Sequence, residues 1–229
     1  MIETATGLVL RTRPLTETSL IVQWLTPNLG RLATVAKGAR RPKSPLRGKL
    51  DLFYLADFSF ARSRRSELHT LREVNLRETH RGLRRELSAL QQAAYCAALV
   101  EQSTETETPL PAVFELLMGL LNRLAEGLTR PETVFAFELK LLKELGMQPN
   151  YERSELNAGT KQILRTLTDG DWPLIARLKP SEMQVKSLGP FLLDFLTYHL
   201  GKVPKGRNLA LQQPDWESTS SLVERAVGP

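Results

Sequence analysis

The sequence predicts an α+β protein in which a small N-terminal β-barrel is followed by an all-α domain. In the first 78 residues apolar and polar residues alternate, which is the pattern of half-buried strands. From about Leu83 onward, apolar residues recur every three or four positions, as in amphipathic helices. The charge divides at nearly the same place, because residues 1–85 hold 17 Lys and Arg against 7 Asp and Glu, whereas residues 86–229 hold 14 against 18.

The strands of the barrel are expected over residues 6–12, 19–26, 31–37, 52–62 and 68–76. Turn residues separate them: Pro14 lies in the first connection, residues 26–30 (Thr-Pro-Asn-Leu-Gly) form the second, and a basic segment forms the third. Five short antiparallel strands within about 75 residues are typical of the OB-type barrel, with an SH3-like barrel as the alternative. We therefore expect an OB-type domain over residues 1–80.

Helices are expected over residues 83–103, 111–128 and 131–145, then a short one ending near residue 170 and a long one over 181–200. Pro111 suits the first turn of its helix, because proline has no N–H to satisfy there. The spacing of Thr129 and Glu132 predicts a capping box at the start of the next helix.

The last long helical segment carries Gly189 followed by Pro190, and this pair should kink or divide the helix. Residues after Arg207 are rich in Gln, Ser and Pro, which is typical of a loosely attached tail. We therefore expect a helical domain over residues 81–208 and a tail over residues 209–229.

The segment 31–49, RLATVAKGARRPKSPLRGK, holds seven basic residues and no acidic one. Such cations repel one another unless phosphates or solvent separate them, and phosphate binding by Lys and Arg releases counterions from a nucleic acid. The segment therefore favours contact with a polyanion, with a solubilising surface loop as the alternative. A second cluster, Arg62, Arg64 and Arg65, closes the fourth expected strand and either extends this surface or is merely solvated.

Aromatic residues accompany these cations in the barrel half: Trp24, Phe53, Tyr54, Phe58 and Phe60. Proteins that bind single strands pair a cationic groove with aromatic side chains on which bases stack. Phe58 and Phe60, however, share the apolar face of the alternating pattern, which favours a place in the core. Trp24 and Tyr54 fit either role.

No constellation typical of an enzyme occurs in the chain. His69, His80 and His199 lie in three separate elements without a ligand spacing such as HExxH, and there is no GxxxxGK[ST] motif. Asp51 and Asp57 would face one side of a strand but lie roughly 20 Å apart, too far to share a metal ion. We therefore expect a non-catalytic protein with no metal and no cofactor.

Cys96 is the only cysteine, so the chain has neither an internal disulfide nor a cysteine-based zinc site, which fits a reducing cytoplasm. The N-terminus lacks the pattern of a signal sequence, and the apolar stretches are too short to cross a bilayer. A soluble intracellular protein without membrane contact is expected.

Several segments together resemble one family. They are the opening strand with Arg13 and Pro14, ETSLI at 17–21, the turn at 26–30, VAKGARRPKS at 35–44, FELKLLKELGMQPN at 137–150 and LTYHLGKVPKGR at 196–207. These features are similar to those of the bacterial DNA repair protein RecO family, and they cover most of the chain except its C-terminal end.

The resemblance implies a recombination mediator that binds single- and double-stranded DNA, anneals complementary strands, and acts with RecR to load RecA onto strands coated by single-stranded DNA-binding protein (SSB). It also implies a cytoplasmic, nucleoid-associated protein in which Lys37, Arg40, Arg41 and Lys43 contact the DNA backbone. Together with the basic pattern it predicts the DNA-binding residues Arg11, Arg13, Arg31, Lys37, Arg40, Arg41, Lys43, Arg47, Lys49, Arg62, Arg64 and Arg65.

Two features depart from the family pattern. Many members carry a four-cysteine zinc module just after the motif that ends near Pro149, whereas this chain continues YERSELNAGTKQ, without cysteine. The family often has an arginine before its Phe-Glu-Leu motif, where a basic rim receives the acidic C-terminal tail of SSB, but Phe135 and Ala136 occupy those positions here. The basic residues that could dock the tail instead are Arg123, Arg130, Lys140 and Lys143.

Two other functions stay open on the sequence: a scaffold whose barrel docks an acidic protein partner, and an RNA-binding barrel of the translation machinery. A mixed surface of solvated charges is also an adequate account of Lys140 and Lys143, which lie three residues apart on one helix face.

Overall fold

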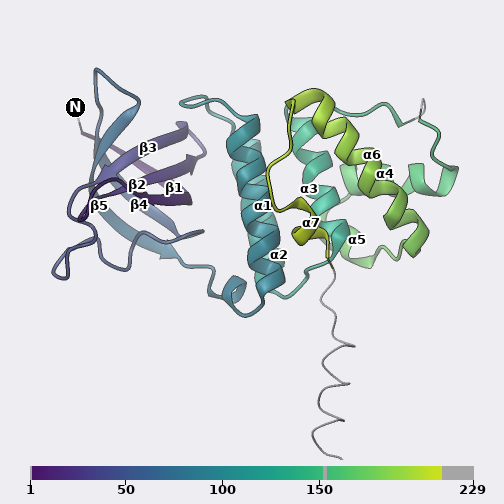
Figure 1. Cartoon of the computed structure of the whole chain (residues 1–229), viewed down its shortest axis with the longest axis horizontal. Coiled ribbons are helices and arrows are strands. Elements are labelled where there is room, and N and C mark those ends of the chain that lie inside the picture. Colours follow the sequence, from purple (N-terminus) through teal and green to yellow (C-terminus); the bar gives the residue numbers. More distant parts are fainter. Residues whose placement is uncertain (1, 152–153, 213–229) are drawn as a thin grey trace, which may run out of the picture.

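Five strands close into a barrel at one end of the molecule. The structure, a computed structural model, describes residues 2–151 and 154–212 (Figure 1). The strands are β1 (Ile2–Pro14), β2 (Leu20–Thr26), β3 (Gly30–Ala36), β4 (Leu55–Ala61) and β5 (Leu68–Glu78). Their order around the barrel is β1-β2-β3-β5-β4, with β4 paired back to β1, which confirms the predicted five-stranded OB-type barrel.

The closure of the barrel corrects the expectation that every strand pairs antiparallel. β3 and β5 run parallel, with Ala33 opposite Leu68 and Val35 opposite Thr70, whereas the other four neighbouring pairs are antiparallel. The reason is geometric. Strand directions cannot alternate all the way around a closed ring with an odd number of strands, so one pair must be parallel.

The barrel interior holds most of the aromatic residues of this half. The Trp24 ring stacks on Phe58 with ring centroids 4.1 Å apart, and Trp24 Nε1 donates a hydrogen bond to Thr34 Oγ1 at 2.9 Å. Trp24, Phe53, Phe58 and Phe60 are each at most 3% exposed. These four rings therefore stabilise the core and are not available to stack on bases, which decides the role of Trp24 that the sequence left open.

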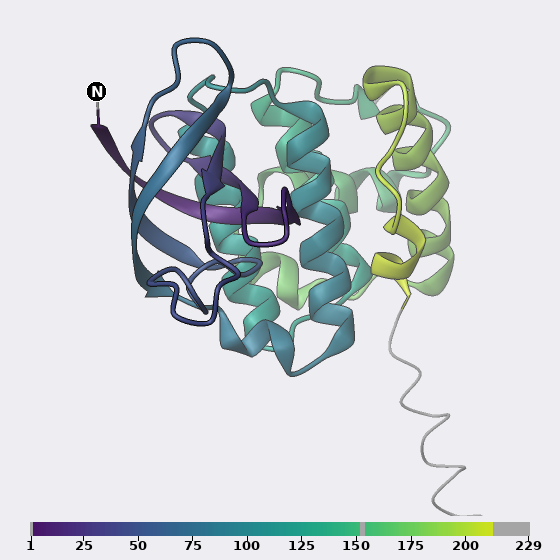
Figure 2. The same ribbon diagram turned by 60° about the vertical axis from the view of Figure 1, so that its left-hand side comes forward.

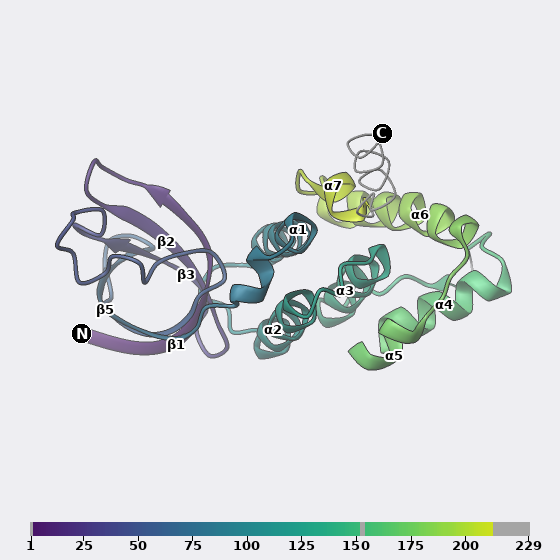
Figure 3. The same ribbon diagram turned by 90° about the horizontal axis from the view of Figure 1, so that it is seen from below.

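The helical segments that follow the barrel are η1 (Arg81–Arg84), α1 (Leu87–Ser103), α2 (Pro111–Ala125), α3 (Pro131–Glu144), α4 (Ala158–Asp169), α5 (Trp172–Arg177), α6 (Glu182–Leu200) and α7 (Arg207–Leu211). Viewed from below, α1 and α2 lie next to the barrel, α3 lies beyond them, and α4, α5 and most of α6 lie at the far end (Figure 3).

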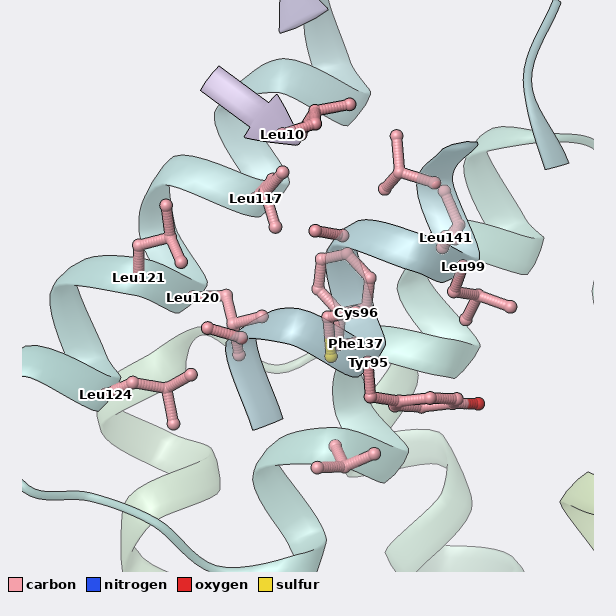
Figure 4. Close-up of a cluster of buried hydrophobic side chains, with 14 of the residues drawn as sticks. Leu10, Tyr95, Cys96, Leu99, Leu117, Leu120, Leu121, Leu124, Phe137 and Leu141 are labelled. Carbon is pink, nitrogen blue, oxygen red and sulfur yellow. The ribbon is translucent and has the colours of Figure 1, made fainter. Parts of the chain in front are cut away.

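The barrel and the helices share one hydrophobic core. Leu8 and Leu10 of β1 belong to the same buried cluster as Leu99 of α1 and Leu117 of α2. Figure 4 shows Leu10 beside Leu117, with the side chains of α1 and α3 below them. The position of the barrel relative to the helices is therefore set by apolar packing.

α3 is the central helix of the helical half, because it is buried on two faces. Phe137 and Leu141 pack into the cluster shared with α1, α2 and β1 (Figure 4). Phe135 and Leu139 pack into a second cluster with α4, α5 and α6. A charged side chain on either of these two faces is removed from water.

α3 nevertheless carries a fully buried carboxylate, Glu138, which is 0% exposed. Its Oε1 and Oε2 accept hydrogen bonds from Arg207 at 2.7 and 2.9 Å, and Oε1 also accepts one from the Tyr95 hydroxyl at 2.6 Å. Arg207 in turn donates to the Gly189 carbonyl at 3.1 Å. Burial and the adjacent Glu138 charge raise the pKa of Tyr95 far above its usual value, so this phenol stays protonated and can only donate to the carboxylate.

The start of α3 differs from the prediction. Proline at the first helical position makes the preceding Arg130 the N-cap, so Thr129 lies one residue too early to form the expected capping box with Glu132. Glu132 instead accepts a hydrogen bond from Arg130 Nη2 at 2.9 Å. A complete capping box occurs at α6, between Ser181 and Gln184.

The C-terminal part of the described chain contains more helix than the sequence predicts. α6 is a single helix with Pro190 inside it, so the Gly-Pro pair does not divide it. The expected start of the tail at residue 209 falls inside α7, because Arg207 and Ala210 are buried against the helical core. The rest of the expected tail, residues 213–229, lies outside the described residues.

No helix in the ranges 2–151 and 154–212 combines the length and the apolar character needed to cross a membrane.

We expect Glu138 and Arg207 to be strongly coupled in the stability of the helical half. Glu138→Gln or Arg207→Met alone leaves one buried charge without its counterion and should lower the free energy of unfolding by about 3–5 kcal/mol. The double variant removes both charges, keeps an acceptor for Tyr95, and should cost less than either single change. Urea unfolding of the three variants measures these values.

The matched control is Lys143→Met, which breaks the exposed pair of Lys143 with Asp169 and should cost about 0–1 kcal/mol. Single and double changes at the buried pair whose costs simply add would contradict the proposed coupling.

Candidate nucleic-acid interface

The connection between β3 and β4, residues 37–54 and named here the basic loop, carries the densest positive charge and is anchored to the barrel. Ala39 and Leu46 are buried in the barrel core. The Arg40 N–H donates to the Thr18 carbonyl at 3.0 Å. Lys49 Nζ donates to the Val74 carbonyl of β5 at 3.1 Å, so Lys49 holds the loop rather than pointing into solvent.

The basic loop exposes five cations: Lys37, Arg40, Arg41, Lys43 and Arg47. Within the described residues none of them forms an ion pair with a carboxylate; Arg40 and Arg47 bond only to main-chain carbonyls, those of Thr16 and Pro42. The loop lies at the lower left of Figures 1 and 2, and its last residues, 51–54, meet the start of the helical half, where Arg84 donates to Asp51 and Leu52. Five uncompensated cations on an anchored loop form a surface suited to a polyanion.

Two further predicted cations lie on β1. Arg11 forms an ion pair with Glu101 of α1 at 3.4 Å, which ties the barrel to the first helix. Arg13 is exposed near the end of β1, beside the turn that the basic loop contacts at Thr18. Of the two, Arg13 extends the exposed cationic surface.

Arg31 is the predicted residue whose surroundings differ most from a solvent-exposed site. Its Nε donates to Thr104 Oγ1 at 2.8 Å, and its Nη2 donates to the Thr104 carbonyl. The Arg31 carbonyl accepts a hydrogen bond from the Glu107 N–H at 2.7 Å, and burial lowers the pKa of the guanidinium. Arg31 therefore joins β3 to the loop between α1 and α2.

The hairpin between β4 and β5 is the second basic cluster, at the upper end of the barrel in Figures 1 and 2 and opposite the basic loop. Arg62 is neutralised there by Glu3 at 2.7 Å and by Glu107 at 2.8 Å. The Arg62 guanidinium holds the pKa of Glu3 below its usual value. Arg64 and Arg65 are exposed at the tip. The structure thus confirms a hairpin here but leaves only two of its three arginines at the surface.

The four cations considered for docking an acidic tail do not converge. Arg123 pairs with Glu126, and Arg130 donates to the carbonyls of Ala176 and Leu178. These two arginines line a small pocket near α5, whereas Lys140 and Lys143 line a separate groove between α2, α3 and α4.

Both lysines of that groove have internal partners. Lys140 Nζ donates to the Thr168 and Gly170 carbonyls at 3.0 and 2.6 Å, and burial lowers its pKa. Lys143 pairs with Asp169 at 2.6 Å, and that hydrogen bond raises the lysine pKa. The four cations therefore stabilise the helical half and do not form one patch.

The run HRGLRR at 80–85 is absent from the predicted DNA-binding residues. Its arginines were included only in the net charge of residues 1–85. The structure exposes Arg81 and Arg85 on the turn between β5 and α1. It also sets the Arg84 guanidinium carbon 5.2 Å from the centre of the half-buried Tyr54 ring. The sequence does contain an indication of this cluster, because residues 81–85 hold three arginines and no acidic residue.

Two family models match the chain. The model described as Recombination protein O N terminal matches residues 1–80, and the model described as Recombination protein O C terminal matches residues 84–155. This chain belongs to the RecO family. The first match covers the barrel with its basic loop, and the second covers α1, α2 and α3.

Individual RecO proteins are also similar in sequence to this chain. The chain is 35% identical over 150 residues to the DNA repair protein RecO of Bacillus subtilis (strain 168), which is 65% of this chain and 58% of the relative. It is 34% identical over 147 residues to that of Rhodopirellula baltica (64% and 54%) and 33% identical over 156 residues to that of Bacillus pumilus (68% and 60%). The matched region thus spans between half and two thirds of the length of these relatives.

Arg31 and Arg41 offer a direct test of how structural and exposed cations differ in this RecO-family barrel. Arg31→Met leaves the partly buried Thr104 groups without their donor and should lower the free energy of unfolding by about 1–3 kcal/mol, with no change in the salt dependence of oligonucleotide binding. Arg41→Met should do the reverse: unchanged urea unfolding and a salt dependence shallower by about 0.7 on a log–log plot. Equal effects of the two changes on binding would contradict the assignment.

Proposed function

We propose that the protein is a non-catalytic recombination mediator that binds single- and double-stranded DNA through its basic loop. The observation that carries the proposal is the set of five exposed cations without carboxylate partners in the described chain, Lys37, Arg40, Arg41, Lys43 and Arg47. Arg13, Arg64 and Arg65 are further candidate contacts. Arg11, Arg31, Lys49 and Arg62 have partners inside the protein and support the surface.

The burial of the barrel aromatics gives this binding a particular character. Because Trp24, Phe53, Phe58 and Phe60 lie in the core, the barrel grips phosphates rather than bases. Neutralised phosphates allow two polyanions to approach, and bases that are not stacked on protein remain accessible for pairing. These are the requirements of strand annealing, which needs no covalent step.

We further propose that the protein acts with RecR to load RecA onto SSB-coated single strands, in a cytoplasmic, nucleoid-associated setting. Membership of the RecO family supports this role. The acidic C-terminal tail of SSB is retained as a partner, but Arg123, Arg130, Lys140 and Lys143 are not assigned as its site. In the proposed division of the chain, residues 1–80 are the nucleic-acid-binding domain, residues 81–208 the helical domain and residues 209–229 the C-terminal tail.

The decisive experiment reverses the charge of the loop motif. Arg40→Glu, Arg41→Glu and Lys43→Glu together should abolish binding of oligonucleotides at low salt and stop annealing of complementary strands, because phosphates would meet carboxylates instead of cations. Fluorescence anisotropy and an annealing assay measure the two effects, and urea unfolding verifies that the variant is folded.

The matched control carries the same charge change elsewhere: Arg177→Glu, Lys202→Glu and Lys205→Glu, all exposed residues of the helical half. It should bind and anneal within about threefold of the unchanged protein. Unchanged binding in the loop variant, or an unchanged protein that neither binds nor anneals at low salt, would refute the proposal.

A further inference from the structure

The turn between β5 and α1, which contains η1, is held rigidly against the helical half. Leu83 is fully buried in the core shared with α1 and α2. Gly82 packs so closely on α2 that a Cβ would lie 2.4 Å from the Ala125 carbonyl oxygen. On the other side, His80 Nδ1 lies 2.7 Å from the Phe53 carbonyl at the end of the basic loop. Side chains on the outside of this turn therefore project from a fixed backbone.

Arg81 and Arg85 are exposed on this turn. In the described chain neither guanidinium forms an ion pair or a side-chain hydrogen bond. Glu78 is close enough to Arg81 for their charges to interact, but its carboxylate accepts hydrogen bonds from the N–H groups of Thr79 and His80 at 2.8 Å, and these bonds lower the pKa of Glu78. The turn thus keeps two cations available to a further anion.

Arg84 connects this turn to the basic loop. Its Nη2 donates to Asp51 Oδ2 at 2.9 Å and to the Leu52 carbonyl at 3.1 Å, both at the end of the loop. Its guanidinium also lies over the ring of Tyr54. These contacts of Arg84 fix the position of the turn relative to the end of the basic loop.

The basic loop and η1 lie along the same lower edge of the molecule in Figures 1 and 2, and Figure 3 views that edge from below. Arg84 contacts the end of the basic loop at Asp51, Leu52 and Tyr54, and Arg81 and Arg85 are its exposed neighbours on the same turn. The barrel cluster at Arg64 and Arg65 lies at the opposite end and does not join this series.

We propose that a single DNA strand bound at the basic loop continues over Tyr54 and Arg84 and ends on Arg81 and Arg85, at the junction with the helical half. This inference rests on the proposed function. It extends that function by giving the bound strand a path that continues beyond the basic loop, and therefore a longer binding site. Arg81 and Arg85 contact phosphates, whereas Arg84 orders the junction through Asp51 and Tyr54.

The test compares the double variant Arg81→Ala, Arg85→Ala with the unchanged protein on oligothymidines from roughly 8 to about 30 nucleotides, a series that starts within the site size of one OB fold. On the long oligonucleotides the log–log salt dependence should be shallower by about 1.4, because two phosphate contacts of about 0.7 each are lost. On the shortest ones, which the loop alone can hold, affinity should stay within about twofold.

The matched control is Lys202→Ala, Lys205→Ala, which removes two exposed charges from the connection between α6 and α7 and should leave the salt dependence unchanged at every length. A double variant at 81 and 85 that matches the unchanged protein on long oligonucleotides overturns the path. Failure of the proposed function is distinguishable, since then the unchanged protein binds no oligonucleotide of any length.

Discussion

The buried ion pair between Glu138 and Arg207 is the interaction on which the arrangement of the helices depends. A charge removed from water costs several kcal/mol unless it is paired and fully hydrogen-bonded. Here the carboxylate of α3 takes partners from α7 and, through Tyr95, from α1, while Arg207 also reaches the Gly189 carbonyl of α6. Satisfying one carboxylate therefore positions four helices relative to one another. Because α1 and α2 also pack on β1 and β2, the barrel takes its place from the same framework.

Local patterns predicted the five strands and the helices α1, α2, α3, α4 and α6, because each of these shows its own apolar period, whereas the short segments η1, α5 and α7 were not predicted. What the sequence did not indicate are relations between distant residues. The parallel pairing of β3 with β5 follows from the closure of a five-stranded ring, which no single strand reveals. Residues 209–211 were expected to belong to the tail, because the partner that anchors their helix through Arg207 lies 69 residues earlier.

The candidate site shows the same division. The density of Lys and Arg in residues 37–47 correctly indicated an exposed cationic loop, since so many charges cannot enter a core. Which cations stay uncompensated could not be inferred, because the neutralising groups are remote in sequence. Glu3 and Glu107 neutralise Arg62, and Thr104 accepts hydrogen bonds from Arg31. The cations at 81–85 fall at the expected boundary between the barrel and the helical domain, and at the level of sequence they were included only in the total charge of residues 1–85.

The separation of Glu138 from Arg207 also has a consequence for biosynthesis. A ribosome adding roughly 5–20 residues per second needs about 3–14 s to travel the 69 residues between them, and the carboxylate has no counterion during that time. The barrel, complete by Glu78, can close much earlier. A nascent chain would therefore present a finished barrel beside helices that still lack their final partner, and chaperones would meet the second half of the molecule rather than the first.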